Sequence, residues 1–197
     1  MATAETRDGL VRATQEAIRQ KGMSGATARE IAGRASANLA AIPYHFGSKD
    51  DLVAEALLAE ARELVAPVLA LLGRDEPGPE RAAAAVALLN DLFDRSRDRV
   101  PVYLGALAAA PHRPRVQDGL RDLWGELRTG LAHDIEAQVA AGVLPAWVAP
   151  DAMAELILSV VNGVVVASAL GDDGPAHRDV AAQFLMLLLA ARPPDAS

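Results

Sequence analysis

The sequence predicts an all-α protein, with an N-terminal three-helix unit in a helix-turn-helix arrangement followed by a larger helical bundle. Three observations lead to this prediction. Apolar residues recur every three or four positions along most of the 197-residue chain, which is the period of an amphipathic helix. No segment reads convincingly as a strand. Glycine and proline clusters divide the second part of the chain into segments of helical length, at residues 73–79, 111–114, 142–150 and 171–175.

The first predicted helix has one apolar face. Leu10, Ala13, Ala17 and Ile18 lie on that face at helical spacing. Gly22 ends the helix, because glycine adopts the left-handed conformation that closes many helices. This helix and the two that follow should form one compact unit.

A second helix begins at about Thr27. Thr27 and Glu30 have the spacing of a capping box, in which the hydroxyl and the carboxylate each accept a hydrogen bond from a backbone N–H. Residues 36–38 interrupt the helix with turn-forming side chains, and Asn38 is the expected cap of a third helix. The apolar stripe of the second helix comprises Ala28, Ile31, Ala32 and Ala35.

The third predicted helix spans residues 39–46 and has two different faces. At about 100° per residue, Leu39, Ile42 and Phe46 point inward. The opposite face and its flanks carry small side chains, one phenol and one imidazole. Alanine methyls can touch thymine methyls, and the two polar rings can donate hydrogen bonds to phosphates or base edges. These outward residues are Ala40, Ala41, Pro43, Tyr44 and His45.

A fourth helix follows directly. Gly47 permits the left-handed residue that ends the third helix, and Ser48 with Asp51 caps the next one. Lys49 lies in its first turn. A helix N-terminus combined with an ammonium group can bind an anion such as a phosphate.

The rest of the chain is predicted to form the larger bundle. The fourth helix runs over residues 50–72, with a bend expected near Pro67. Two later segments, 152–170 and 184–190, are apolar on almost all sides, which is more than the core of one chain requires. We expect them to form a two-fold dimer interface, and the alternative is that both are internal core of a monomer. The later helices are expected at residues 79–98, 102–110, 115–141, 151–170 and 176–191.

Composition excludes several classes of function. The chain has no cysteine, which rules out disulfides, thiol nucleophiles and thiolate metal sites. Its four histidines show no i, i+4 pairing, so we expect no metal site. It also lacks a Gly-x-Ser-x-Gly turn, a phosphate loop and a His-Glu-x-x-His helix. We therefore expect neither an enzyme nor a bound cofactor.

The charge distribution favours a nucleic-acid partner for the first domain only. The net charge is −7, but residues 1–49 hold seven basic and four acidic side chains, whereas the remainder holds twelve and twenty-two. Screening makes the local charge more important than the total. The N-terminus lacks an apolar signal segment, so a cytoplasmic protein is expected. Segment 152–170 contains Glu155, Ser159 and Asn162 and lacks basic flanks, which argues against a membrane span.

At these residues the chain resembles the TetR family of bacterial one-component transcriptional regulators. Thr27, the pair 31–32, Ile42 and the run 44–49 match the family pattern in order and spacing. The chain departs from that pattern at Ser36, where the family usually has glycine, and at Pro43, where it usually has a tyrosine that contacts a phosphate. Pro43 is expected to remove a backbone hydrogen bond to the Leu39 carbonyl.

The resemblance implies a ligand-responsive DNA-binding regulator, most often a repressor released from operator DNA by a small molecule. Residues 1–49 would bind double-stranded operator DNA as a homodimer on a near-palindromic site. Residues 50–197 would bind the effector and dimerise. The alternative is a helical protein-interaction module that does not bind DNA. The residues expected to contact DNA are Thr27, Arg29, Asn38, Ala40, Ala41, Pro43, Tyr44, His45 and Lys49.

The effector pocket is expected among the larger apolar side chains of the middle helices. Aromatic residues make up only 4% of the chain, which favours a small apolar effector. The residues expected to line the pocket are Phe93, Tyr103, Leu107, Trp124 and Leu127.

Overall fold

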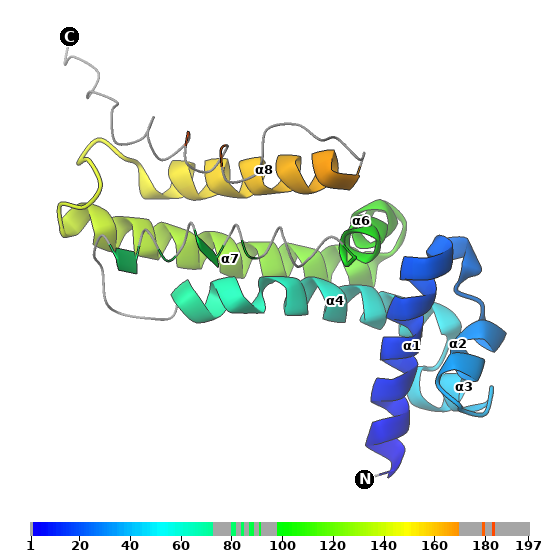
Figure 1. Ribbon diagram of the computed structural model, residues 1–197. Helices are drawn as coiled ribbons and strands as arrows, with labels where there is room; N and C mark the ends of the chain where they lie inside the picture. Colours follow the sequence, from blue (N-terminus) through cyan, green and yellow to red (C-terminus); the bar gives the residue numbers. More distant parts are fainter. Residues whose placement is uncertain are drawn as a thin grey trace. The chain divides into compact units, whose positions relative to one another are not determined.

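The computed structural model describes residues 2–72, 80–81, 84, 87–88, 91, 98–169, 179 and 183. Within these residues all regular secondary structure is helical, which confirms the predicted fold class (Figure 1). The elements are α1 (Ala2–Gly25), α2 (Ala28–Arg34), α3 (Ala41–Phe46), α4 (Lys49–Leu72), α6 (Val100–Ala109), the short 3₁₀ helix η1 (Ala110–His112), α7 (Pro114–Ala140) and α8 (Pro150–Ala169).

The predicted boundaries of the later helices agree with α4, α6, α7 and α8 to within two residues. α4 continues through Pro67 to Leu72. The helices predicted at 79–98 and 176–191 fall largely outside the described residues. Of their described residues, 80, 81, 84, 87, 88, 91, 179 and 183 are helical, and residue 98 lies in a turn.

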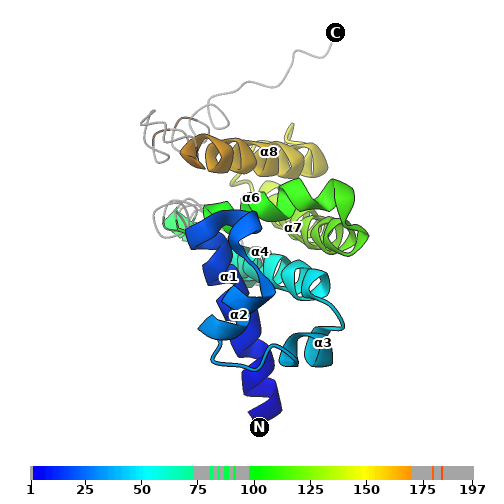
Figure 2. The ribbon, with the colours of Figure 1, turned by 90° about the vertical axis from the view of Figure 1, so that its right-hand side faces the viewer.

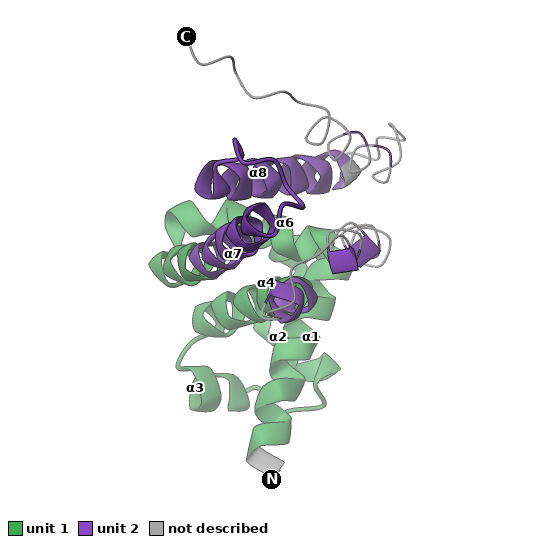
Figure 3. Cartoon of the chain, turned by 90° about the vertical axis from the view of Figure 1, so that its left-hand side faces the viewer, with its two compact units in different colours: residues 1–65, 98–123 green, residues 66–97, 124–197 purple. Residues whose placement is uncertain are grey.

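The chain divides into two compact units (Figure 3). Unit 1 comprises residues 1–65 and 98–123, and unit 2 comprises residues 66–97 and 124–197. Unit 1 therefore contains the whole predicted helix-turn-helix segment together with α6 and the beginning of α7. The functional boundary predicted between residues 49 and 50 is a different division, and it remains a prediction.

The core of unit 1 is built on the apolar face of α1. α1 packs against α2, α3 and α6, and Figure 2 shows α2 and α3 lying beside it. The four residues predicted for this face are all buried. Gly22 has φ 71 and ψ 178, so it interrupts the helix as predicted, although a short helical turn continues to Gly25. The largest fully buried apolar side chains of unit 1 are Leu10, Ile18, Ile31, Leu52, Leu57, Val102 and Val116.

Unit 2 has its own apolar cluster where the second half of α7 meets the start of α8. Ile135, Val148 and Ala154 are buried at its centre, and Trp147 and Ile157 pack against them. Residues 142–148 form the turn that brings the two helices together, with Gly142 at φ 72. This packing fixes one side of α8.

The other side of α8 is open within the described residues. Leu156 and Val166 are each 46% exposed. The window Pro150–Ala167 is long and apolar enough to cross a membrane by length and composition, and 17% of it is buried. The single chain therefore leaves much of this apolar helix uncovered by the described residues.

Candidate nucleic-acid interface

The start of α2 confirms one half of the predicted capping box. The Thr27 Oγ1 accepts a hydrogen bond from the Glu30 N–H at 3.2 Å. The other half is wrong: the Thr27 N–H donates to the Gly25 carbonyl at 2.9 Å. The Glu30 carboxylate instead pairs with Lys21 Nζ at 2.9 Å and with Arg34 Nε at 2.7 Å. Charged donors bind a carboxylate more strongly than a backbone amide does.

These two cations also set the protonation of Glu30. The hydrogen bond from Lys21 and then that from Arg34 lower the pKa of the Glu30 carboxyl. Because the folded-state pKa lies below that of the unfolded chain, Glu30 contributes stability above the unfolded pKa. That contribution is lost as the pH falls through the folded-state pKa.

The turn between α2 and α3 depends on Ser36. Ser36 has φ 50, the only positive φ among the described residues other than glycine. This left-handed region favours glycine and costs other residues about 1 kcal/mol. The Ser36 N–H donates to the Gly33 carbonyl at 3.2 Å, and the Ala37 N–H donates to the Ala32 carbonyl at 2.9 Å. Serine thus occupies a glycine-like position and closes α2 in the same way.

The helix α3 begins two residues later than predicted. Ala40 is its N-cap residue, and Asn38 precedes the helix. The Asn38 Oδ1 accepts a hydrogen bond from the Ala40 N–H at 2.9 Å, which forms an Asx turn and not the predicted helix cap. Leu39 was predicted to point inward but is 47% exposed. It lies in the turn before the helix, where the helical period does not apply.

Pro43 does not remove a hydrogen bond from α3, contrary to prediction. Because the helix begins at Ala41, Pro43 is its third residue. Backbone N–H groups in a first turn have no intrahelical acceptor, so proline loses nothing there. The Leu39 carbonyl accepts a hydrogen bond from the Ile42 N–H instead, at 3.3 Å.

The outward face of α3 is open. Tyr44 is 78% exposed, and Ala40 and Pro43 are also exposed. Ile42, which is 2% exposed, anchors the opposite face in the core. His45 is half-buried, and its ring lies 4.9 Å from that of Tyr44 in an edge-on arrangement. The face therefore exposes Ala40, Pro43 and the large ring of Tyr44, with Leu39 exposed in the turn before it.

The start of α4 forms as predicted. Gly47 has φ 81 and ends α3. The Ser48 Oγ accepts a hydrogen bond from the Asp51 N–H at 3.0 Å and donates to Asp51 Oδ2 at 2.6 Å. Lys49, the first residue of α4, is exposed. Its ammonium group and the N-terminus of α4 therefore follow directly after α3.

The remaining residues predicted to contact DNA differ in their exposure to solvent. Thr27 and Arg29, at the start of α2, are exposed, as is Asn38 in the turn. Ala41, the first residue of α3, is half-buried. The structure therefore places these residues on or near the α2–α3 pair, and their contact with DNA remains a prediction.

Sequence reasoning missed the residues that hold α3 in place. The Arg7 guanidinium lies 5.1 Å from the centre of the Phe46 ring, a cation–π distance. Arg7 also pairs with Glu55 of α4. Arg115 of α7 pairs with the same carboxylate at 3.4 Å. No local pattern could have revealed these contacts, because they join residues 39 or more positions apart.

The predicted effector-pocket residues are not brought together within one unit. Tyr103 is buried and Leu107 half-buried in α6 of unit 1. Trp124 is half-buried and Leu127 buried in α7 of unit 2. Phe93 lies outside the described residues. The pocket therefore remains a prediction.

Comparison with protein families gives two matches. The family described as "Bacterial regulatory proteins, tetR family" matches residues 10–56. The family described as "BetI-type transcriptional repressor, C-terminal" matches residues 78–192. Together the two matches cover the region around α3 and most of the remaining chain.

Individual proteins agree with these matches. The chain is 30% identical to the HTH-type transcriptional regulator BetI of Stenotrophomonas maltophilia over 155 residues, which are 72% of this chain and 76% of that protein. It is 27% identical to BetI of Brucella anthropi over 166 residues, which are 84% and 82%. A putative transcriptional regulator from Saccharomonospora viridis, solved in complex with choline, has the same fold, with a TM-score of 0.76, 22% identity and coverage of 93% and 94%.

Proposed function

This chain belongs to the TetR family of bacterial regulatory proteins and is a ligand-responsive DNA-binding transcriptional regulator, and we propose that it is a dimeric repressor that a small molecule releases from operator DNA. The observation that carries the proposal is the open face of α3, which is followed directly by the N-terminus of α4 with its exposed Lys49. The dimer places two such faces in successive major grooves, about 34 Å apart. The protein acts in the cytoplasm, where bacterial DNA is accessible.

The outward face of α3 and the turn before it, with Leu39, Ala40, Pro43 and Tyr44 exposed, form the proposed reading face. The exposed residues of this face and of the neighbouring α4 N-terminus have two roles. Ala40, Tyr44 and the unexpected Leu39 touch base edges and thymine methyls, and so select sequence. Lys49 and the α4 N-terminus bind a phosphate, and so add affinity for any sequence. Thr27, Arg29, Asn38 and the α3 residues Ala41, Pro43 and His45 complete the DNA-facing surface.

The exposed side of α8 is the proposed dimer interface. Among the described residues, four large apolar side chains are strongly exposed, and they fall in two places. Leu39 and Tyr44 belong to the reading face, and Leu156 and Val166 belong to α8. Burying α8 against its copy would remove from water the apolar surface that the described residues leave open.

Titration of the upstream DNA of its own gene with purified protein tests the proposed function. We expect binding whose affinity falls steeply as salt rises, because phosphate contacts release counterions. Lys49→Ala should weaken binding to every sequence and reduce the slope of log affinity against log salt by about one. Arg62→Ala, a change of an exposed cation further along α4, serves as the control and should leave the slope unchanged. Salt-insensitive or absent binding would favour the protein-interaction module.

The effector is proposed to be a small organic molecule with an apolar surface. The Saccharomonospora viridis protein was solved with choline, whose trimethylammonium group combines apolar methyls with a positive charge. Aromatic rings recognise such groups through cation–π attraction. Trp124, half-buried in α7 of unit 2, is the aromatic side chain that we assign to that task.

Choline and its uncharged carbon analogue, in which a tert-butyl group replaces trimethylammonium, separate the two kinds of effector. We expect choline to release the protein from operator DNA and the analogue to do so at much higher concentration, because only choline carries the charge. Fluorescence anisotropy of labelled operator measures the release of the protein by each of the two compounds. Release by the analogue alone would restore the purely apolar effector predicted from composition, and release by neither would exclude this class of ligand.

A further inference from the structure

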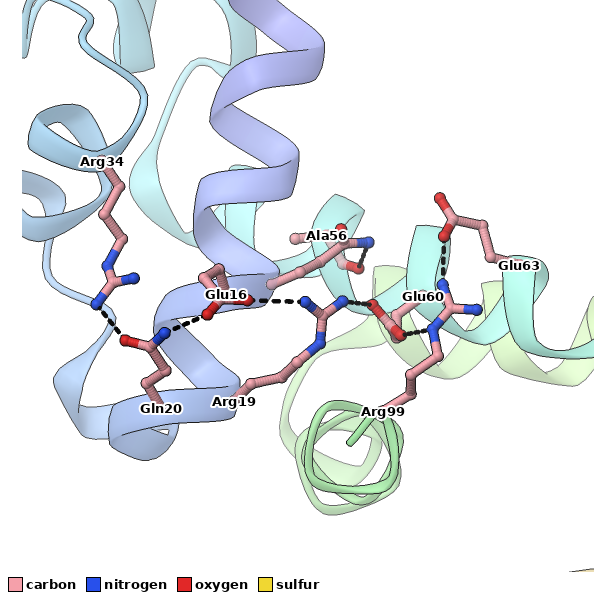
Figure 4. Close-up of polar contacts among 9 residues, drawn as sticks. Glu16, Arg19, Gln20, Arg34, Ala56, Glu60, Glu63 and Arg99 are labelled. Carbon is pink, nitrogen blue, oxygen red and sulfur yellow. Dashed lines mark hydrogen bonds and ion pairs between the residues drawn. The ribbon is translucent and has the colours of Figure 1, made fainter. Parts of the chain in front are cut away.

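A continuous chain of polar contacts connects α2 to the start of α6 within unit 1 (Figure 4). Arg34 of α2 donates to Gln20 at 2.8 Å, and Gln20 donates to Glu16. Glu16 accepts from Arg19 at 3.0 Å. The chain then passes through Glu60 to Arg99. Its members, in spatial order, are Arg34, Gln20, Glu16, Arg19, Glu60, Arg99 and Glu63.

Glu60 is the centre of this chain. Its side chain is 0% exposed, and its two oxygens are held by arginines from two other elements. Arg19 of α1 reaches Oε2 through Nη2 at 2.9 Å, and Arg99, which precedes α6, reaches Oε1 through Nε at 2.5 Å. Arg99 also pairs with Glu63 one turn further along α4. Three elements therefore meet at one buried carboxylate.

A buried ion pair often adds little net stability to a fold. Removing charges from water costs several kcal/mol per ion, so an apolar side chain of similar volume is often equally stable or more stable. Leu57, Ala61 and Leu64 lie on the same face of α4 and are buried, so a leucine at position 60 would continue the apolar stripe. The charged group instead fixes the positions of its partners, because among the described residues it accepts hydrogen bonds from Arg19 and Arg99.

The geometry around Arg19 is consistent with this interpretation. Arg19 Nε is buried and has no hydrogen-bond partner among the described residues. The other two nitrogens of this guanidinium bridge Glu16 and Glu60. The two carboxylates therefore hold the Arg19 side chain between α1 and α4.

We propose that Glu60, Arg19 and Arg99 are positioning residues for DNA reading. α1 packs against α2, α3 and α6, so the point where α1 is fixed to α4 and α6 also fixes the α2–α3 pair that α1 carries. Arg99 acts on DNA affinity through Glu60 and Arg19 and does not touch DNA. This inference rests on the proposed operator binding and adds to it the residues that hold the reading helix in its binding position.

Arg99→Ala is the central test. We expect operator affinity to fall about tenfold, a typical size for coupling between sites, with the slope of log affinity against log salt unchanged. An unchanged slope means that no phosphate contact was lost. Arg121→Ala is the matched control, because the partner of the exposed Arg121 among the described residues is Asp118 of the same helix, α7. It should bind operator like the unaltered protein.

A double-mutant cycle shows whether Arg99 acts through Glu60. In the Glu60→Gln background, Arg99→Ala should have no further effect on affinity. If Glu60→Gln does not fold, Arg99→Lys replaces it, since lysine keeps one charged contact with Glu60 and should recover part of the affinity.

Three results would overturn the inference. Arg99→Ala could lower the melting temperature and leave operator affinity unchanged, which would make the cluster purely structural. It could reduce the salt slope by about one, which would make Arg99 a phosphate contact. In the double variant, the loss of operator affinity caused by Arg99→Ala could add fully to the loss caused by Glu60→Gln. Failure of the unaltered protein to bind its operator is a separate result, and that result contradicts the proposed function itself.

Discussion

Ala40→Glu is expected to reduce operator affinity by at least about a hundredfold, because like charges brought together at an interface cost several kcal/mol. Ala40 is exposed at the N-cap of α3, so a carboxylate there would meet the phosphates and base edges that the reading face approaches. The same carboxylate is compatible with the fold, since a negative charge is favourable at a helix N-terminus. Gel shift or fluorescence anisotropy with operator DNA measures the loss.

A control separates this effect from a general change in charge. Ala66→Glu makes the same chemical change at an exposed position of α4 and should reduce affinity only slightly. Unchanged melting temperatures for both variants would show that they are folded. Operator binding by Ala40→Glu at the level of the unaltered protein would show that α3 does not read DNA through this face.

Leu156→Asp is expected to convert the protein into a monomer and to lower operator affinity by about a hundredfold or more, because two linked half-sites bind far more tightly than one. Leu156 is 46% exposed in the single chain, so aspartate there is solvated and the monomer should fold. At a two-fold interface the same position meets its own copy or a nearby apolar residue, and a buried charge without a partner is strongly unfavourable.

Sedimentation velocity at micromolar concentration measures the association state, and the operator titration is repeated beside it. Ala140→Asp, at an exposed position of α7 in the same unit, is the matched control and should remain a dimer. An unaltered protein that sediments as a monomer would reject the proposed interface. A Leu156→Asp variant that remains a dimer would place the interface elsewhere.

The sequence predicted several local features of the N-terminal helices correctly. The cap at Ser48, the left-handed Gly47 and the buried stripe of α1 were all predicted and are confirmed. Each depends on residues within about one or two helical turns, and such interactions follow from side-chain chemistry and the helical period alone. The family resemblance rests on the same short-range features.

The start of α3 and the contacts of Glu30 depend on which of several possible hydrogen-bond partners a side chain takes. The sequence alone does not show this choice. Asn38 could cap a helix or close an Asx turn, and in the structure it closes the turn. That choice moves the helix start to Ala41, exposes Leu39 and makes Pro43 harmless. Glu30 likewise had a backbone partner and two charged partners within reach, and the charged partners prevailed.

By itself, the sequence determined the helices, most of their ends and the order of the reading unit, because these follow from neighbouring residues. Its period could also have marked Glu60 as a charge in an apolar stripe of α4. Only the tertiary structure decided which partners that charge has, since Arg19 and Arg99 lie 41 and 39 positions away. A buried carboxylate must be neutralised by whatever cations the packing of helices brings to it, and that packing is settled by the whole of unit 1.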